Sequence, residues 1–129
     1  MILLWNSAEM HVQFDLIDDS GVVHAYEWEA GRTLARDMLK YLNDRLAEYQ
    51  ATFDDISAIG VYRGPGSFTG LRIGLAVLNT LADANAVPIV GETGDGWKAQ
   101  ALARLEQSEN DRLVLPEYGG DAHITKPRK

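Results

Sequence analysis

The residues of this chain that are best placed to do chemistry form one glycine-rich stretch. It reads Arg63-Gly64-Pro65-Gly66-Ser67-Phe68-Thr69-Gly70-Leu71-Arg72-Ile73-Gly74 and lies between an apolar run and a long apolar helix pattern. Backbone N–H groups at a helix start are unpaired and carry the positive end of the helix dipole, so a phosphate could bind there. The candidate phosphate contacts are Arg63, Gly64, Pro65, Gly66, Ser67, Thr69, Gly70 and Arg72. Phosphate binding would make the chain a small nucleotide-binding, phosphotransferase-like protein.

A structural interpretation of the same stretch needs no ligand. Gly64-Pro65-Gly66 places a residue of fixed φ between two residues with little steric restriction, which lets the chain reverse sharply. Ser67 or Thr69 can then cap the helix. A nucleotide P-loop requires Gly-x-x-x-x-Gly-Lys-Ser/Thr, and this stretch has neither the lysine nor the spacing. The sequence therefore favours a tight turn between a strand and a helix.

Other groups that could catalyse a reaction are sparse. Ser67 lies in a Gly-x-x-x-Gly pattern without an evident histidine and acid partner, so it does not resemble an activated nucleophile. His11, His24 and His123 lack the spacing of metal ligands, and the first two fall on the predicted exposed side of a hairpin. The chain contains no cysteine, which excludes thiolate chemistry. We predict no catalytic residue, no metal site and no cofactor held by this chain alone.

Hydrophobic periodicity predicts the elements that position the glycine-rich stretch. Strands are expected over residues 1–5, 10–17, 22–28, 58–62 and 86–91, and helices over about 33–49, 67–84 and 97–105. The first three strands form a meander, and the later strands alternate with helices. We predict one lobe over residues 1–110, followed by an extended segment and a mobile tail over 111–129.

This order of elements predicts an α/β fold with a five-stranded mixed sheet and flanking helices. It is the ribonuclease H-like order, which the actin and sugar kinase superfamily shares. Nucleases and phosphotransferases of this fold need a carboxylate on or just after the first strand to hold a metal or polarise a water. The chain has Trp5-Asn6-Ser7 at this place. The missing carboxylate argues against catalysis.

The helix expected over residues 67–84 is apolar around most of its circumference, whereas a helix that covers one face of a sheet needs one apolar face. Gly70 and Gly74 lie four residues apart, so another helix could approach closely on that side. We therefore expect a partner helix from another chain. On this interpretation Leu75→Glu or Gly74→Leu would abolish partner binding and leave the fold intact.

Composition limits the classes of function. Apolar residues make up 46% of the chain and charged residues 24%, as in ordinary soluble domains. No apolar run approaches the roughly 18 residues of a membrane span, and the absence of cysteine fits a reducing compartment, so we expect a cytoplasmic protein. The net charge of −7 disfavours direct binding of nucleic acid, although Lys126, Arg128 and Lys129 make the last residues basic.

The stretch from Arg63 to Leu75 resembles the signature of the TsaB (YeaZ) family, and the similarity extends over about residues 1–100. The resemblance implies a non-catalytic subunit of the bacterial machinery that places threonylcarbamoyl on N6 of adenosine 37 in tRNA (t6A). Members bind the catalytic paralogue TsaD through two helices of this lobe, and the ATPase TsaE joins the pair. A homodimer through the same helices is an alternative, and the resemblance leaves open ATP or ADP at the partner boundary.

Mapped onto this chain, the resemblance places the TsaD interface on the helices that begin near residues 34 and 67. The implied interface residues are Leu34, Met38, Tyr41, Leu42, Arg45, Leu71, Gly74, Leu75, Leu78 and Ala82. The chain departs from the family in two ways. Trp5 and Asn6 stand where members have an acidic residue and a threonine, and the usual second lobe is nearly absent after Leu105. The chain thus resembles a one-lobe version, with tRNA reached only through the complex.

Overall fold

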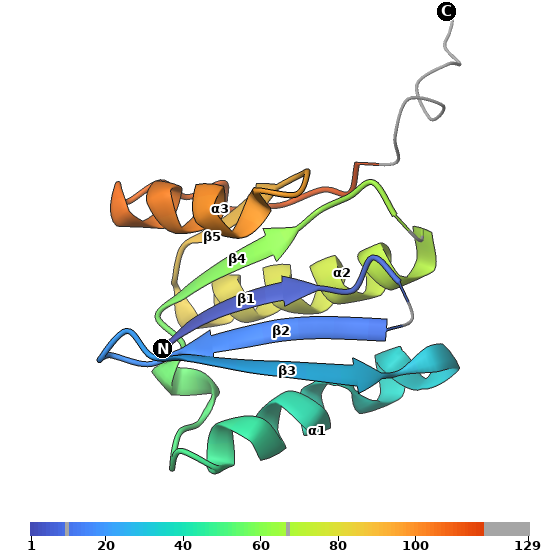
Figure 1. The fold of residues 1–129 in the computed structure, drawn as a ribbon, viewed down its shortest axis with the longest axis horizontal. Coiled ribbons are helices and arrows are strands. Elements are labelled where there is room, and N and C mark those ends of the chain that lie inside the picture. The colour runs from blue at the N-terminus through green and yellow to red at the C-terminus, as the bar shows by residue number, and fades with distance from the viewer. Residues whose placement is uncertain (10, 67, 118–129) are drawn as a thin grey trace, which may run out of the picture.

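The computed structural model describes residues 1–9, 11–66 and 68–117, and of Phe68 it describes the backbone alone. In this described part of the chain, five strands form one sheet in the order β3-β2-β1-β4-β5. β1 pairs antiparallel with β2 and β2 with β3, whereas β4 runs parallel to both β1 and β5. The strands are β1 Ile2–Asn6, β2 His11–Ile17, β3 Val23–Glu29, β4 Ala58–Tyr62 and β5 Ile89–Glu92. The predicted mixed sheet of five strands is confirmed (Figure 1).

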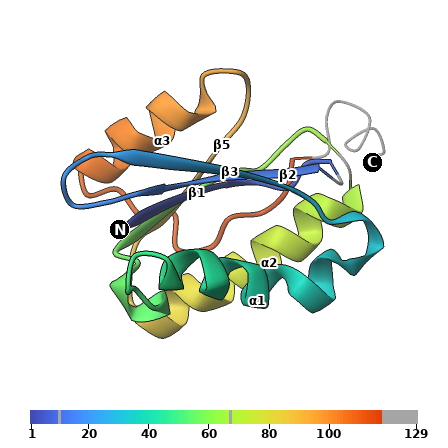
Figure 2. The same cartoon turned by 60° about the horizontal axis from the view of Figure 1, so that its bottom comes forward.

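Within the described ranges, three α-helices cover the sheet. They are α1 Leu34–Ala47, α2 Phe68–Asn85 and α3 Trp97–Glu106, and two short 3-10 turns, Gly31–Thr33 and Phe53–Asp55, connect elements. α1 and α2 lie side by side on one face of the sheet, and α3 lies on the opposite face (Figure 2). None of the helices within the described ranges combines the length and the hydropathy that a bilayer span requires.

The apolar alternation of β2 explains the two layers. Val12, Phe14 and Leu16 are buried in the main core, which α1 and α2 cover. The alternate residues face α3, where Leu4, Ile17, Val90, Trp97 and Ala101 form a smaller cluster. Asp15 is buried on this second face and pairs with Lys98 of α3 at 2.9 Å. The α3 helix therefore covers the side of β2 that carries Asp15.

The three parallel strands end at the same edge of the sheet. β1 ends at Asn6, β4 at Tyr62 and β5 at Glu92, and the registers align these ends. The carboxyl edge of parallel strands is where α/β folds usually place their ligand sites. The β1–β2 loop, the glycine turn and the start of α2 meet at this edge (Figure 1).

Residues 109–117, here called the strap, run from α3 along the free edge of β5. The Asp111 N–H donates to the Ile89 carbonyl at 2.8 Å, and the Gly91 N–H donates to the Asp111 carboxylate at 2.9 Å. Asn79 of α2 holds Val114 through two hydrogen bonds of 2.9 Å. The strap thus continues the hydrogen bonding of the sheet without being a strand. The mobile tail predicted over residues 119–129 lies outside the described residues.

Candidate functional site

The glycine turn after β4 folds against the chain's own backbone. The Arg63 N–H donates to the Glu92 carbonyl at 2.9 Å, and the Glu117 N–H donates to the Arg63 carbonyl at 2.7 Å. Gly64 has φ +124, a conformation that favours glycine, and a Cβ there would clash with the Glu117 carbonyl. The tight turn is confirmed, and it connects the end of β4 to β5 and to the strap.

The remaining glycines of the stretch receive the β1–β2 loop. A Cβ on Gly66 would meet Ala8, one on Gly70 would clash with the Ser7 carbonyl, and one on Gly74 would clash with side-chain atoms of Ser7 and Trp5. The expectation that Gly70 and Gly74 admit a partner helix is therefore wrong. These glycines let the chain's own loop approach α2, because no side chain separates the two backbones.

A buried hydrogen-bond chain fixes this contact. The Trp5 indole N–H donates to the Ser7 hydroxyl at 2.9 Å, and the hydroxyl donates to the Gly70 carbonyl at 2.8 Å. Trp5 and Ser7 are each 1% exposed. A buried hydroxyl and indole need such partners, since an unpaired polar group in the interior is costly. The loop in which related folds carry their catalytic carboxylate is thus occupied by Trp5 and Ser7 in a packing role.

The described part of the turn borders a cavity of about 230 Å³, whose lining includes Pro65 and Gly66 together with Glu9 and His11. Gly64, Gly66 and Gly70 contact the chain's own atoms, and Thr69 and Arg72 are exposed side chains of α2. Ser67, the other candidate contact, lies outside the described residues. Within the described ranges no group of three or more histidine, cysteine, aspartate and glutamate residues could hold a metal ion. Phosphate binding at the turn stays a prediction.

The interface residues implied by the resemblance are mostly interior. Seven apolar members have exposed fractions between 0 and 3%, and they are Leu34, Met38, Leu42, Leu71, Leu75, Leu78 and Ala82. Gly74 is buried beneath Trp5. The assignment of these eight residues to a partner surface is corrected here, because α1 and α2 turn this stripe towards their own sheet. Leu75→Glu and Gly74→Leu would consequently disrupt the fold itself.

The other two implied interface residues are half-buried at the outer side of α1. The Tyr41 ring stacks on Trp28, with ring centroids 4.5 Å apart. The Arg45 guanidinium lies 5.1 Å from the centre of the Tyr41 ring and pairs with Glu48 at 3.1 Å. These side chains cover the edge of the sheet at β3, and their aromatic and ionic contacts are made within the chain.

An exposed apolar groove does lie between α1 and α2, on the side away from the sheet. Its volume is about 450 Å³, and its lining is Leu39, Ala76, Val77, Thr80, Leu81 and Ala84. Leu39 is 49% exposed. We call this surface the helix groove. It confirms that α2 is apolar on two sides, but the residues differ from those implied by the resemblance. Leu39, which interrupts the polar side of α1, was the sequence signal that could have identified it.

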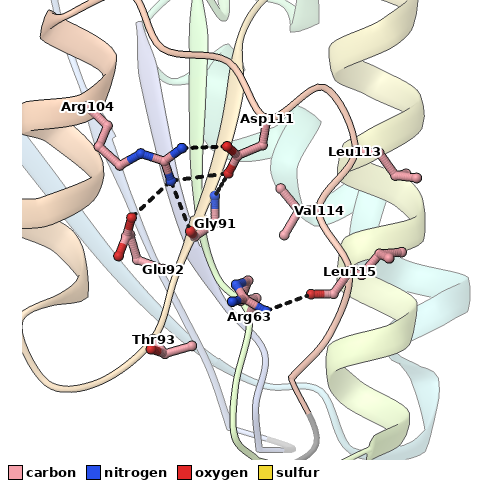
Figure 3. Close-up of a pocket in the computed structure, with 9 residues that line it drawn as sticks. All are labelled: Arg63, Gly91, Glu92, Thr93, Arg104, Asp111, Leu113, Val114 and Leu115. Carbon is pink, nitrogen blue, oxygen red and sulfur yellow. Dashed lines mark hydrogen bonds and ion pairs between the residues drawn. The ribbon is translucent and has the colours of Figure 1, made fainter.

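A second cavity, here called the strap pocket, opens at the carboxyl end of β5 (Figure 3). Its volume is about 520 Å³, and its lining is Arg63, Gly91, Glu92, Thr93, Arg104, Asp111, Leu113, Val114 and Leu115. Arg104 of α3 reaches Glu92 at 2.9 Å and Glu109 at 2.7 Å, and it also pairs with Asp111. No short motif marks this network, because its members come together only when the strap folds back.

The network changes the acidity of its members. Hydrogen bonds from Arg104 to Asp111, then to Glu109 and Glu92, raise the pKa of Arg104. Burial alone would raise the pKa of Asp111, but hydrogen bonds from Arg104 and the Gly91 N–H outweigh burial and lower it. Arg104 and Asp111 therefore remain ionised and join α3, β5 and the strap.

The predicted exposed histidines differ from each other. His11 is half-exposed, and its two ring nitrogens lie 2.5 Å from Glu29 and 2.5 Å from Glu27. Hydrogen bonds to Glu29 and then Glu27 raise its pKa. His24 packs on the Tyr49 ring, with centroids 4.4 Å apart. The expectation of an exposed position is therefore wrong for His24, because it points to the α1 side of β3.

Comparisons with known proteins bear on the family and the fold of this chain. The family model described as "TsaD: tRNA N6-adenosine threonylcarbamoyltransferase" matches residues 22–109. A "tRNA threonylcarbamoyladenosine biosynthesis protein TsaB" from Haemophilus influenzae is 33% identical over 81 residues, which are 63% of this chain and 34% of that protein. A "tRNA N6-adenosine threonylcarbamoyltransferase" from Bacillus thuringiensis is 39% identical over 95 residues, which are 74% of this chain and 28% of that protein.

The solved structure described as "YeaZ from Pseudomonas aeruginosa" matches with a TM-score of 0.67 and 28% identity, over 83% of this chain and 49% of that chain. The chain therefore spans about half the length of this structure and about a third of the curated TsaB relatives it matches. The family model covers more than half of the chain, and the TsaB and YeaZ matches agree with it. The chain belongs to the TsaB (YeaZ) family, within the wider family that includes the threonylcarbamoyltransferase TsaD.

Proposed function

We propose that this chain is a non-catalytic subunit in the t6A modification of tRNA, and that it binds a TsaD-like protein through the helix groove. The observation that carries the proposal is the groove itself. Leu39, Val77 and Leu81 present apolar surface to solvent between two helices whose other faces already cover the sheet. Burial of apolar surface drives most protein association, so a partner that covers the groove would be held there by removing these side chains from water.

The shape of the groove favours another helical surface as the occupant. Ala76, Thr80 and Ala84 succeed one another at four-residue spacing along α2, and their small side chains let a facing helix approach closely. This chain is similar both to proteins named TsaB and to proteins named as the TsaD transferase. A TsaD-like partner would therefore carry its own pair of equivalent helices, and the two pairs could pack about a pseudo-two-fold axis.

The non-catalytic role is supported by the site at the end of β1. Trp5 and Asn6 stand where the family has an acidic residue and a threonine, and the Asn6 side-chain oxygen accepts the Ala8 N–H at 2.8 Å. The proposal gives the chain no cofactor of its own, and ATP or ADP at the partner boundary stays a prediction. The net charge of −7 supports contact with tRNA only through the partner. A TsaE-like ATPase is expected from the family alone, and we assign it no surface.

The alternative of a small nucleotide-binding protein has less support, since the glycines of the turn hold the chain's own loop. A homodimer is the stronger competitor because it would use the same helix groove. An isologous pair would place Leu39 and the α2 alanines of two copies against each other. The experiment below treats the homodimer as a separate outcome.

The proposal is tested by co-expression of the chain with the TsaD-like protein of the same organism, followed by sizing and a t6A assay. Ala76→Glu places a charge in the helix groove, and Ala103→Glu is the matched control on the exposed side of α3. We expect Ala76→Glu to keep the fold by circular dichroism and to lose the complex and t6A formation, because burying an unpaired charge is costly. Ala103→Glu should retain both.

Two outcomes would overturn the proposal. One is a wild-type chain that never elutes with the TsaD-like protein, whether or not it forms a homodimer. The other is an Ala76→Glu variant that binds as tightly as the control, which would place the partner on a different surface. A homodimer that dissociates when the TsaD-like protein is added would support the proposal, since both partners would then compete for the helix groove.

A further inference from the structure

The large apolar side chains that stay exposed lie at two places on the described part of the chain. Three of them flank α2. Leu39 lines the helix groove and is 49% exposed, and Leu113 and Leu115 of the strap are 60% and 62% exposed. The other two, Val22 and Val23, lie at the turn between β2 and β3. Since α2 lies between α1 and the strap (Figure 1), apolar side chains are exposed on both sides of this helix.

The two strap leucines point away from the sheet, because Val114 between them points into it. Val114 is 3% exposed, belongs to the main core that α1 and α2 cover, and packs on Gly91 of β5. Side chains alternate in direction along an extended segment. Figure 3 shows Leu113 and Leu115 directed away from Gly91, on the side of α2. The leucines therefore face solvent on the same face of the sheet as the outer surface of α2.

The contacts that hold the strap do not use these leucine side chains. The Asp111 carboxylate pairs with Arg104 and accepts the Gly91 N–H, and the side chain of Asn79 binds both the N–H and the carbonyl of Val114. These contacts fix the backbone on either side of Leu113. Polar side chains in place of the leucines would leave them intact, so the strap does not need leucine at these positions for its own attachment.

The strap adjoins the helix groove across one ridge of α2. Ala76 lines the groove and Asn79 holds the strap, and residues three apart on a helix are neighbours on its surface. The small side chain of Ala76 adds little height to this ridge. A partner that covers the groove can therefore pass over α2 and reach Leu113 and Leu115.

The two flanks of the groove differ in polarity, and this difference indicates the side to which a partner extends. The outer surface of α1 carries charged residues in exposed ion pairs, Arg36 with Asp37 at 2.8 Å and Lys40 with Asp44 at 2.9 Å. The strap presents leucines. Packed helices lie about 8–10 Å apart, so the second of two partner helices falls on one flank of a groove that holds the first. Burial of apolar surface favours the flank with the strap.

We propose that the strap is the second half of the partner surface. One helix of the TsaD-like protein packs in the helix groove, and its neighbouring helix packs against Leu113 and Leu115. This inference rests on the proposed function, because the same partner covers both surfaces. It also gives the Arg104–Asp111 ion pair a role in binding, since this pair and Asn79 hold the leucines in place before the partner arrives. Such preorganisation lowers the entropy lost on association.

The test measures how tightly the full chain binds the TsaD-like protein of the same organism. The variant Leu113→Ser/Leu115→Ser removes the apolar surface of the strap. Val22→Ser/Val23→Ser is the matched control, because it changes the other pair of exposed apolar side chains, 51% and 54% exposed. We expect both variants to keep the circular dichroism of the wild type. The strap variant should bind at least about tenfold more weakly, since it loses the burial of two leucines, and the control should bind as the wild type.

A second measurement reports contact at the strap directly. The chain has no cysteine, so Leu115→Cys and Val23→Cys each supply a single thiol for a fluorophore whose emission depends on polarity. We expect the emission of the label at residue 115 to shift to shorter wavelength when the TsaD-like protein is added, because the partner removes the label from water. The label at residue 23 should not respond. This readout decides the question if the serine variant displaces the strap, which the amide shifts of Asp111 and Val114 would reveal.

Three results would overturn the inference while the complex still forms. The strap variant could bind as tightly as the control, the label at residue 115 could stay unchanged in the complex, or this label could shift with rising concentration of the chain alone. The last result would place a second copy of the chain on the strap. In each case the helix-groove proposal stands if Ala76→Glu loses the complex and Ala103→Glu retains it, so the two failures are distinguishable. A wild-type chain that binds no TsaD-like protein would overturn both proposals.

Discussion

Replacement of Gly74 by alanine tests the contact between α2 and the β1–β2 loop. The new Cβ would clash with the Ser7 hydroxyl and come within 2.6 Å of the Trp5 indole nitrogen. Both side chains are 1% exposed, so neither can move into solvent without opening the core. We expect the Trp5–Ser7–Gly70 hydrogen-bond chain to break.

The magnitude follows from three terms. An unsatisfied buried polar group costs about 1–3 kcal/mol, and overpacking a dense core costs about 1–3 kcal/mol. Alanine in a helix interior gains about 1 kcal/mol over glycine, which offsets part of this loss. The free energy of unfolding should therefore fall by about 1–5 kcal/mol, a large part of the stability of a domain of this size.

Urea denaturation followed by circular dichroism measures this change. The matched control is Gly96→Ala, since a Cβ at Gly96 would lie 3.6 Å from the Gln100 side chain, an ordinary contact. Gly96 is the N-cap residue of α3, where glycine is preferred over alanine, so the control should lower the free energy of unfolding by no more than about 1 kcal/mol. A Gly74→Ala protein that is as stable as the wild type, or more stable, would refute the packing role of this glycine.

Three further predictions concern other parts of the chain. Leu75→Glu should prevent folding by circular dichroism, whereas Ala76→Glu should not, because adjacent residues of α2 face the core and the solvent; equal stability of the two variants would contradict this. Asp111 has a lowered pKa, so its ion pair with Arg104 stabilises the fold above the unfolded pKa of about 3.9, and this stabilisation is lost as pH falls through the folded pKa. In a plot of the urea midpoint of unfolding against pH, Asp111→Asn should therefore reduce the fall of the midpoint at acid pH. His11 has a raised pKa, so the stabilisation that it contributes is present below about pH 6.5 and is lost as pH rises through the folded pKa. Changing both Glu27 and Glu29 to glutamine should lower the NMR titration midpoint of His11. An unchanged midpoint would contradict the contact.

Elements of the fold could be predicted from the sequence because each has a clear period. β4 Ala58–Tyr62 begins and ends as predicted, and α2 Phe68–Asn85 is displaced by one residue. β5 was predicted to begin at residue 86 but begins at Ile89, since Val87 and Pro88 complete the turn after α2. The periodic apolar signal locates an element well and its ends less well.

The surfaces could not be predicted in the same way. A stripe such as Leu71, Leu75, Leu78 and Ala82 is equally suited to a sheet and to a partner, and the hydrophobic pattern alone does not distinguish them. The structure distinguishes the two, because the stripe with the larger side chains packs on the sheet. The smaller Ala76 and Ala84 are left outside, together with part of Val77 and Leu81. Arg104 and Asp111 come into contact only in the folded chain, so no local sequence pattern predicted their ion pair.

The glycines and the leucines of α2 show which side of this helix is left for the proposed partner. The glycine side receives the β1–β2 loop and the leucine side covers the sheet, so the requirements of the domain are met by these two sides. The third side, with Ala76, Thr80 and Ala84, adds nothing to that core. Polar residues there would make the isolated chain more soluble at no cost in packing. An apolar third side is therefore a disadvantage to the chain alone and becomes an advantage only when another protein covers it.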